Sequence, residues 1–384
     1  MVKKIGFLTG TRADYGKIKS LLDQIVLHNS EFELHVLVTG MHLEAKYGST
    51  VNQILADYLG NIHFIPNQAG RFSMELTLAR TIEQLSSFLD VIELDLLVVH
   101  GDRVEALAGA ITCSLKNIPV GHIEGGELSG TIDGIIRHAI SKLVNIHFVA
   151  NSSAKKRLIQ LGENLNSIYV IGSPDIDALL SENLPTIQDT KLRYGIPFKN
   201  YSIFIFHPVT NEIELLQSQI TNVCDALIQS NRNYIVISPN NDLGTEIIQR
   251  TLERKLLGFK YKHFPSMRFE SFLTILKFSD FIIGNSSAGI REAGYYGVPC
   301  INIGTRQKSR HRSDLIINTS AEIIPILEAI EISKTIKRIP EYKFGKGDSA
   351  MEFIKILTSN DFWPIKLEKD FVDIFMRTNG DIND

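Results

Sequence analysis

The stretch "IGFLTGTRADYGKIK", residues 5–19, decides the fold because an apolar strand gives way directly to a helix there. Residues 5–8 form a continuous apolar run, which is typical of a strand covered on both faces. A glycine and two threonines follow, and helical spacing of apolar residues runs over 16–27. An arginine, an aspartate and a lysine lie in this short connection, and a purely structural turn does not need them. The stretch therefore predicts a strand–helix unit whose connection carries a function.

The same alternation of apolar runs and helical patterns continues along the chain. It predicts parallel sheets with helices on both faces. In the first half, strands are expected at residues 4–9, 32–39, 95–100, 118–123, 146–150 and 167–172, with helices at 16–27, 74–89, 104–116 and 131–143. After a polar stretch that contains prolines, at 171–201, the pattern restarts with strands at 202–207, 233–238, 262–264, 280–284 and 300–304.

This organisation is typical of an α/β protein with two doubly wound, Rossmann-like domains. The expected domains are residues 1–180 and 181–358, and an amphipathic helix within 359–384 is expected to pack back on the first domain. A length of 384 residues fits two domains of ordinary size.

The composition excludes several classes of protein. Apolar residues make up 44% and charged residues 22%, as in globular proteins, and the net charge of -3 gives no basis for nucleic-acid or membrane-surface binding. No apolar run approaches the ~18 residues of a membrane-spanning helix. Cys113, Cys224 and Cys300 are far apart in apolar runs, which indicates reduced thiols in a cytoplasmic protein and no metal site.

Polar and charged residues follow strand after strand in both halves. In open α/β sheets, ligands bind outside the carboxyl ends of the strands, so these residues are candidates for a site. The groups lie at residues 9–12, 100–103, 124–133, 207–210, 239–242, 284–289 and 304–306. Two such domains facing each other predict a ligand in the central cleft.

The turn "GNSSAGIREAGYYG", residues 284–297, has the composition of a phosphate-binding connection. Backbone N–H groups at a helix start bind phosphate oxygens, and Ser286 and Ser287 add hydroxyl groups. Gly284 lets the backbone approach closely, and Glu292 could hold ribose hydroxyls. The alternative is a simple helix cap formed by Ser286 or Ser287. Neither the P-loop nor the Rossmann glycine pattern is present.

The loop "GTRQKSRHR", residues 304–312, concentrates positive charge after a strand. Arg306 follows the strand directly and is predicted to contact a diphosphate. Lys308, Arg310 and Arg312 are expected to be solvated instead.

The carboxylates of the first domain are candidates for proton transfer. Asp102, Glu124, Glu127 and Asp133 lie at or near strand ends, where closely placed carboxyl groups can divide acid and base roles. Structural alternatives remain for three of them. Asp133 could complement a helix dipole, Asp102 could pair with the adjacent Arg103, and Glu127 could be exposed. Among the histidines, His207 at a strand end is a candidate, whereas His122, His138 and His147 are given no role.

With these motifs, the chain resembles the hydrolysing UDP-N-acetylglucosamine 2-epimerases, and more closely their bacterial branch that feeds sialic-acid-type sugar synthesis. The resemblance covers nearly the whole chain. It rests on the motifs "GTRADYGKIK", "VTGMHLEAKYG", "HGDRVEALAGA", "HIEGGELSGTIDGIIRHAISKL", "FHPVT", "PNND", "GNSSAGIREA" and "INIGTRQKSR". "HIEGGELSGTID" separates the chain from the non-hydrolysing epimerases, which usually have "H-x-E-A-G-x-R" there.

The resemblance implies a GT-B fold with UDP held mainly by the C-terminal domain, no metal or redox cofactor, and a homodimer or homotetramer. It implies elimination of UDP through a 2-acetamidoglucal intermediate, followed by hydration to the manno-configured sugar. The residues matching the family's functional positions are Asp102, Glu124 and Asp133 for elimination and hydration, Arg12, Lys17 and His207 for the diphosphate, and Ser286, Ser287, Glu292, Arg306, Asn240 and Gly284 for the UDP. Asp14 is expected to cap or pair locally.

Three other interpretations remain open at the level of sequence. The same reaction could act on UDP-2,4-diacetamido-2,4,6-trideoxyglucose, on the way to legionaminic acid. A GT-B glycosyltransferase would share the UDP site but needs an acceptor, and the three carboxylates argue against it. A regulatory protein that binds a nucleotide sugar without turnover would have little use for several acids beside the sugar.

Overall fold

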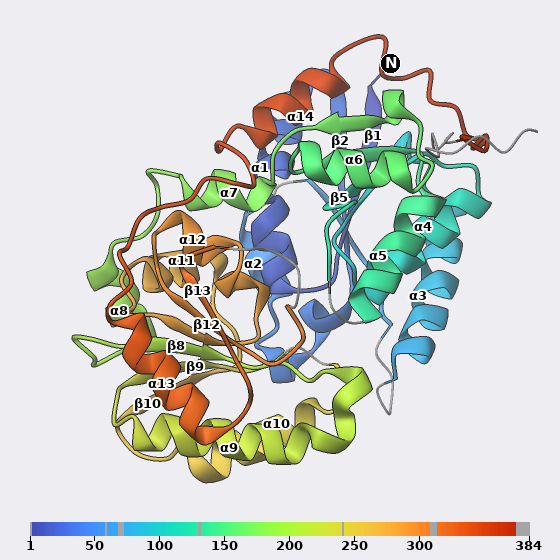
Figure 1. Cartoon of the computed structure of the whole chain (residues 1–384). Coiled ribbons are helices and arrows are strands. Elements are labelled where there is room, and N and C mark those ends of the chain that lie inside the picture. The colour runs from blue at the N-terminus through green and yellow to red at the C-terminus, as the bar shows by residue number, and fades with distance from the viewer. Residues whose placement is uncertain are drawn as a thin grey trace, which may run out of the picture.

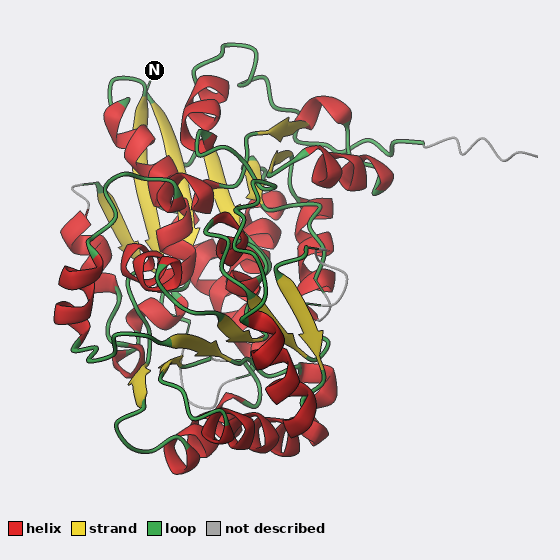
Figure 2. Ribbon diagram, turned by 60° about the vertical axis from the view of Figure 1, so that its left-hand side comes forward, coloured by secondary structure: helices red, strands yellow, loops and turns green. Residues whose placement is uncertain are grey.

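The computed structural model describes residues 2–57, 60–67, 73–129, 132–239, 242–307 and 313–373. Two parallel sheets, each with helices on both faces, form two lobes (Figures 1 and 2). This confirms the α/β class and the doubly wound sheets predicted from the sequence. Among the described residues, no helix combines the length and the apolar character needed to cross a bilayer.

The first sheet has seven strands in the order β3-β2-β1-β4-β5-β6-β7. They are β1 Lys3–Thr9, β2 Phe32–Val38, β3 Asn61–Phe64, β4 Leu96–His100, β5 Val120–Ile123, β6 Ile146–Val149 and β7 Ile168–Val170. The helices of this half are α1 Arg12–Leu27, α2 Val51–Asp57, α3 Met74–Leu89, α4 Val104–Leu115, α5 Ile132–Leu143, α6 Ser152–Gln160 and α7 Pro174–Leu179. Two 3₁₀ turns, Gly40–Leu43 and Ala45–Tyr47, follow β2, and a third, Leu165–Ser167, precedes β7.

The second sheet has six strands in the order β10-β9-β8-β11-β12-β13. They are β8 Ser202–Ile205, β9 Tyr234–Ile237, β10 Tyr261–Phe264, β11 Ile282–Gly284, β12 Cys300–Ile303 and β13 Ile316–Thr319. The helices are α8 Ile187–Tyr194, α9 Leu216–Gln229, α10 Thr245–Lys255, α11 Phe269–Lys277, α12 Glu292–Tyr295, α13 Ile323–Ser333 and α14 Ser349–Leu357, with 3₁₀ turns at Thr210–Leu215 and Ser287–Gly289.

The strand orders place a topological switch point in each sheet. In the first sheet the chain order reverses between β1 and β4, and in the second between β8 and β11. A crevice opens at such a point because the connections on its two sides run to opposite faces. The residues that follow β1, β4, β8 and β11 are therefore the ones that the fold presents to a ligand.

Alternate residues of the strands face two separate apolar cores in each half. In β1, Ile5 and Phe7 face the core that holds α1, whereas Leu8 faces the core that holds α3, α4 and α5. Figure 1 shows these helices on the two sides of the first sheet. The second sheet is covered by α8, α11 and α12 on one face and by α9, α10 and α13 on the other.

Two edge strands were missed by the sequence patterns. β3 and β13 close one edge of each sheet, and their residues are half-buried or exposed. A half-exposed edge strand does not need the continuous apolar run by which the interior strands were recognised.

The helix predicted within 359–384 was wrong over the part of it that the structure describes. Residues 359–373 form turns and extended chain, and Pro364 explains why, since proline lacks the N–H that a helix interior needs. The segment packs against the first half through Phe362, and the Asn145 amide donates to the carbonyls of Lys366 and Leu367. The chain returns to the first half earlier, in α14, which lies beside α1.

We expect Phe353→Ala to destabilise the protein by ~3–5 kcal/mol, because it removes a large side chain from a packed core. Phe353 is 0% exposed, and its ring centroid lies 6.1 Å from that of Phe7 and 4.9 Å from that of Phe148. The measurement is the free energy of unfolding in urea. Met351→Ala on the same helix, at a residue 59% exposed, is the control and should change it little. Equal effects of the two substitutions would show that α14 is not part of the core.

Candidate active site

A cavity of about 260 Å³ lies between the carboxyl ends of the two sheets. Ten of the twelve predicted site residues line it: Arg12, Lys17, Asp102, Glu124, Asp133, His207, Ser286, Ser287, Glu292 and Arg306. Of the other two, Gly284 is buried outside the lining, and Asn240 lies outside the described residues, as do Lys308, Arg310 and Arg312. The switch points of both sheets thus open on one cavity.

The connection after β1 places its cations in the first two turns of α1. The helix begins at Arg12, four residues earlier than the sequence pattern indicated, with Thr11 as its N-cap. Arg12 donates to the Ser266 hydroxyl of the second half at 2.9 Å. Lys17 lies 3.1 Å from Glu292 and 3.6 Å from Asp175.

Lys17 keeps its charge in this buried place. Burial alone would lower the pKa of its ammonium group, but the carboxylates of Glu292, Asp175 and Glu124 outweigh burial and raise it. The lysine therefore links α1 to the second half as a permanent cation.

Asp102 and Glu124, which follow β4 and β5, are joined by Arg137 of α5. Arg137 donates to Asp102 Oδ2, to the Glu124 carbonyl at 2.8 Å and to Glu124 Oε2 at 3.4 Å. The alternative that Asp102 only pairs with the adjacent Arg103 was wrong, because Arg103 instead lies 3.2 Å from Glu105 and 3.9 Å from Asp242.

Glu124 stands in an unusually positive environment. Its Oε1 lies 3.1 Å from Arg291, 3.3 Å from His100 Nε2 and 4.0 Å from Lys17. Burial would raise the pKa of this carboxyl group, but Arg291, His100 and Lys17 hold it well below its usual range. Its backbone φ of +69° is rare for a residue with a side chain, and such strain is common at functional sites.

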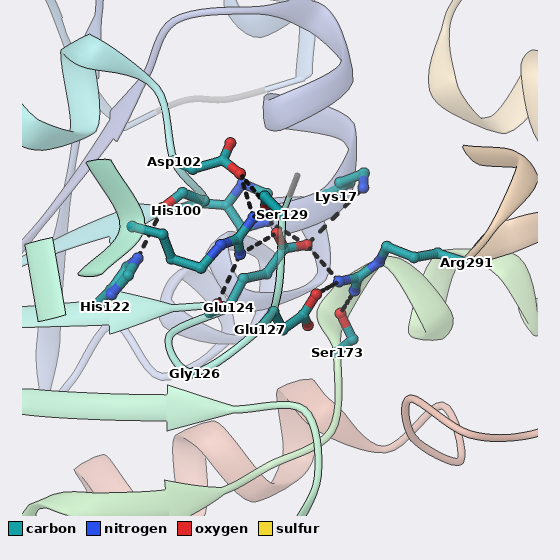
Figure 3. A network of polar contacts seen from close by, with 12 residues as sticks. Lys17, His100, Asp102, His122, Glu124, Gly126, Glu127, Ser129, Ser173 and Arg291 are labelled. Atoms are coloured by element: carbon teal, nitrogen blue, oxygen red, sulfur yellow. Dashed lines mark hydrogen bonds and ion pairs between the residues drawn. The ribbon is translucent and has the colours of Figure 1, made fainter. Parts of the chain in front are cut away.

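Arg291 is a fully buried cation between the two halves (Figure 3). It precedes α12 in the second half and donates to Glu127 at 2.5 Å, to Asp175 at 3.2 Å and to the Ser173 hydroxyl. Glu127 is consequently buried, and the alternative that it is exposed was wrong.

Asp133 and Arg306 face each other across the cavity. Asp133 lies in the first turn of α5, and its carboxylate accepts from Arg306 at 3.1 Å. Arg306 also donates to the Asn285 carbonyl at 3.3 Å. A residue predicted for proton transfer and one predicted for the diphosphate are therefore paired directly.

The connections after β8 and β11 support each other. The Asn285 side chain accepts from the His207 backbone N–H at 2.6 Å and donates to the His207 carbonyl at 2.8 Å. Burial, followed by the charges of Arg306 and Arg103, holds the pKa of His207 well below its ordinary value. His207 is therefore a neutral imidazole at neutral pH.

The serine-rich turn is more compact than expected. Ser286 accepts from the Ala288 N–H and caps the 3₁₀ turn Ser287–Gly289, so the capping alternative holds for this residue. The helix that follows, α12, has only four residues. Both serines line the cavity, so the turn offers hydroxyl groups to a ligand without a long helix behind it.

Several site residues were not singled out from the sequence: His100, Arg137, Asp175 and Arg291. Arg137 could have been found, because it lies four residues after Asp133 and so on the same face of a helix. His100 and Arg291 lie in stretches that the sequence pattern marked, at 100–103 and 284–297, but their partners and that of Asp175 are distant in sequence and no local pattern predicts those pairs.

Comparison with known proteins assigns the chain to a class. The family model for UDP-N-acetylglucosamine 2-epimerase matches residues 25–358. The chain belongs to the UDP-N-acetylglucosamine 2-epimerase family.

Individual relatives cover most of the chain. A UDP-N-acetylglucosamine 2-epimerase from Neisseria meningitidis is 44% identical over 97% of this chain and 100% of its own length. A UDP-N,N'-diacetylbacillosamine 2-epimerase (hydrolyzing) from Legionella pneumophila is 38% identical over 86% and 88%. Polysialic acid biosynthesis protein P7 from Escherichia coli is 35% identical over 97% and 98%.

Solved structures share the fold. A UDP-GlcNAc 2-epimerase from Neisseria meningitidis, bound to UDP-GlcNAc, has a TM-score of 0.77 at 18% identity, over 92% of this chain and 99% of that one. The Methanocaldococcus jannaschii enzyme in complex with UDP-GlcNAc and UDP has a TM-score of 0.79 at 20% identity, over the same shares. These similarities confirm the GT-B-like fold.

We expect Gly284→Ala to lower the free energy of unfolding by at least ~2 kcal/mol, because its φ of +132° strains any side chain. A Cβ there would also lie 1.8 Å from the Ile205 carbonyl oxygen. The control is Gly294→Ala in α12, where a Cβ meets nothing within 4 Å and alanine favours the helix. If Gly284→Ala unfolded at the same denaturant concentration as the wild type, the strained connection would have no role in stability.

Proposed function

We propose that this protein is a hydrolysing UDP-N-acetylglucosamine 2-epimerase, which converts UDP-N-acetylglucosamine and water to N-acetylmannosamine and UDP. The observation that carries the proposal is the single cavity in which three first-half carboxylates face cations and hydroxyl groups from both halves. The 44% identity to the Neisseria relative over nearly the full chain supports the choice of substrate.

The proposed reaction has two steps. In the elimination, a base takes the C2 proton while the C1–oxygen bond breaks and UDP leaves with the bonding electron pair, which gives 2-acetamidoglucal. In the hydration, water adds its oxygen at C1, and a proton is delivered to C2 from the opposite face. The sum is hydrolysis with inversion at C2 and no change in redox state.

Departure of UDP needs its developing negative charge to be stabilised. Arg12, Lys17 and Arg306 are cations around the cavity that can serve the diphosphate. Neutral His207 can donate a hydrogen bond to it but brings no charge. Ser286, Ser287 and Glu292 remain the proposed contacts of the UDP on the second half.

The surroundings of the carboxylates suggest different roles for them. Glu124 is held ionised by its cations, so it has no proton to donate and only the role of base is open to it. Asp133 has Arg306 as its partner, and a diphosphate that binds Arg306 would remove that partner and add negative charge nearby. Both changes raise the pKa of Asp133 and favour it as the proton donor. Asp102, tied to Arg137, would support this exchange.

The runner-up changes the sugar and keeps the chemistry. Relatives from Legionella pneumophila and Campylobacter jejuni, at 38% and 31% identity, are named for hydrolysing epimerisation of UDP-N,N'-diacetylbacillosamine. We place N-acetylglucosamine first because the Neisseria relative has the higher identity and coverage. The Escherichia coli relative, named for polysialic acid biosynthesis, supports a product used for sialic-acid-type sugars.

We expect the purified protein to release UDP from UDP-N-acetylglucosamine in deuterated water and to form N-acetylmannosamine with deuterium at C2. Proton NMR follows both products, and the 2,4-diacetamido-trideoxy substrate is tested in parallel. Turnover of that substrate alone would move the protein to the legionaminic branch. UDP binding without release from either substrate would contradict the epimerase proposal and favour a glycosyltransferase or a regulatory binder.

Substitution of each carboxylate by its amide tests the proposed proton transfers. Glu124→Gln, Asp102→Asn and Asp133→Asn should each lower kcat by about 10²- to 10⁴-fold, the usual contribution of general acid–base catalysis. Calorimetric titration with UDP shows whether the variants still bind. Asp95→Asn is the control, because Asp95 precedes the same strand β4 at its opposite end and pairs with Lys3 at 2.7 Å. If the amide variant of one of these three carboxylates kept full kcat, that carboxylate would have no role in proton transfer.

A further inference from the structure

His100, at the end of β4, lies between two carboxylates and has no part in the roles proposed so far. Its Nδ1 is 2.6 Å from Asp14 Oδ1, and its Nε2 is 3.3 Å from Glu124 Oε1. The contact with Asp14 is a hydrogen bond that needs a hydrogen on Nδ1, whereas Nε2 lies at ion-pair distance from Glu124 Oε1, which accepts no hydrogen bond among the described residues. The side chain is only 8% exposed, so the two carboxylates provide most of its polar surroundings. An imidazolium between the two carboxylates matches this arrangement, with a hydrogen bond to Asp14 and an ion pair with Glu124.

The charges around the ring agree with that state. Burial lowers the pKa of His100, but Glu124 and Asp14 outweigh burial and raise it to about 10. The cations Lys17, Arg137 and Arg291 face Glu124 rather than the ring. His122 of β5 lies nearby with its pKa lowered to about 3, chiefly by burial, so it adds no charge.

Asp14 is held in place by a chain of hydrogen bonds. Its Oδ2 accepts from the Thr9 hydroxyl at 2.8 Å and from the Gly10 N–H at 3.1 Å. The Thr9 oxygen lies 3.2 Å from His42 Nε2, and His42 Nδ1 lies 2.6 Å from the Thr50 hydroxyl.

The directions of these hydrogen bonds can be assigned. Burial lowers the pKa of His42 to about 4, so its ring is neutral. Because Thr9 gives its hydrogen to Asp14, it must accept from Nε2–H of His42, and Nδ1 of His42 then accepts from Thr50. Each member has one assigned role, and Asp14 can turn only by losing its hydrogen bonds from Thr9 and Gly10.

Resting on the proposed function, we propose that Asp14 and His100 form a positioning pair for Glu124. Asp14 orients the ring, and the ring fixes Oε1 of Glu124 in the cavity. The pair lies entirely within the first half, whereas Arg291 reaches Glu124 from the second half and Lys17 is shared with Glu292. Glu124 thereby keeps two partners from the first half, His100 at Oε1 and Arg137 at Oε2, while Arg291 and Lys17 connect it to the second half.

Asp14→Asn tests the pair with almost no change in size. The amide cannot accept on both sides, so either the ring or the Thr9–Gly10 side faces an NH₂ group. With one carboxylate gone, the pKa of His100 falls toward its ordinary value. In the wild type the ring loses its proton only around pH 10, so its charge persists through the usual assay range. In the variant the charge is lost at lower pH.

The expected result is therefore a shift in the pH profile of kcat. The alkaline limb of the Asp14→Asn profile should move into the range of about pH 7–9. At about pH 9 its kcat should be about tenfold or more below that of the wild type, whereas around pH 6 the two kcat values should be similar. KM for the UDP-sugar should change little. His100→Gln should lower kcat at every pH, because no titrating group remains. Asp23→Asn, on the same helix and paired with Lys19 at 3.2 Å, is the matched control.

A second measurement does not depend on turnover. In protein labelled with ¹⁵N-histidine, the His100 signals are identified by their loss in His100→Gln. They should report a charged ring up to about pH 9 in the wild type and titration at lower pH in Asp14→Asn. A neutral ring in the wild type would overturn the inference.

The two proposals fail in different ways. Suppose that the wild type is active and that the pH profiles of kcat for Asp14→Asn and for the wild type run parallel. That result would overturn the positioning pair alone. A wild type that turns over neither UDP-sugar would overturn the proposed function and the catalytic purpose of the pair. A charged His100 in the NMR titration would then still support the pairing itself.

Discussion

The structure depends on the pairing of Arg291 with carboxylates of the first half. This guanidinium is buried between the two sheets and contacts Glu124, Glu127 and Asp175, which come from separate segments of the chain. A buried cation that lost such partners would cost several kcal/mol, so the two halves cannot take another relative position here without replacing them. Because Ser286, Ser287 and Glu292 lie within a few residues of Arg291, the same constraint sets their place opposite the carboxylates.

Topology explains why so many charges meet at this junction. The switch points between β1 and β4 and between β8 and β11 direct their connections into one space. An apolar core would exclude charges from it, whereas the crevice at a switch point leaves room for them. The carboxylates then need cations, and Lys17, Arg137 and Arg291 supply them from three different elements. The charged connection after β1 is thus a consequence of where that strand ends.

The sequence was sufficient for the architecture and for most of the cavity lining, because strand ends are local features. Sequence patterns did not predict the charged pairs whose two residues are distant in sequence. Asp14 pairs locally with Thr9 and Gly10, as expected, but it also contacts His100, which is 86 residues away. Asp102 pairs with Arg137, although Arg103 is adjacent in sequence. The edge strands lacked a continuous apolar run. Pairing of charges is decided by three-dimensional distance, and periodicity carries no information about it.

The pairs that cross the cavity also bear on how tightly a nucleotide can bind. Arg306 contacts Asp133, Lys17 contacts Glu292, and Arg12 contacts Ser266. A diphosphate that takes Arg306 must displace a carboxylate, so its own ion pair is partly offset by the one it breaks. Under the proposed function, UDP would therefore bind less tightly than three cations would suggest, and its release would be easier. In the proposed reaction, the displaced Asp133 would be the carboxylate placed to give a proton to the sugar.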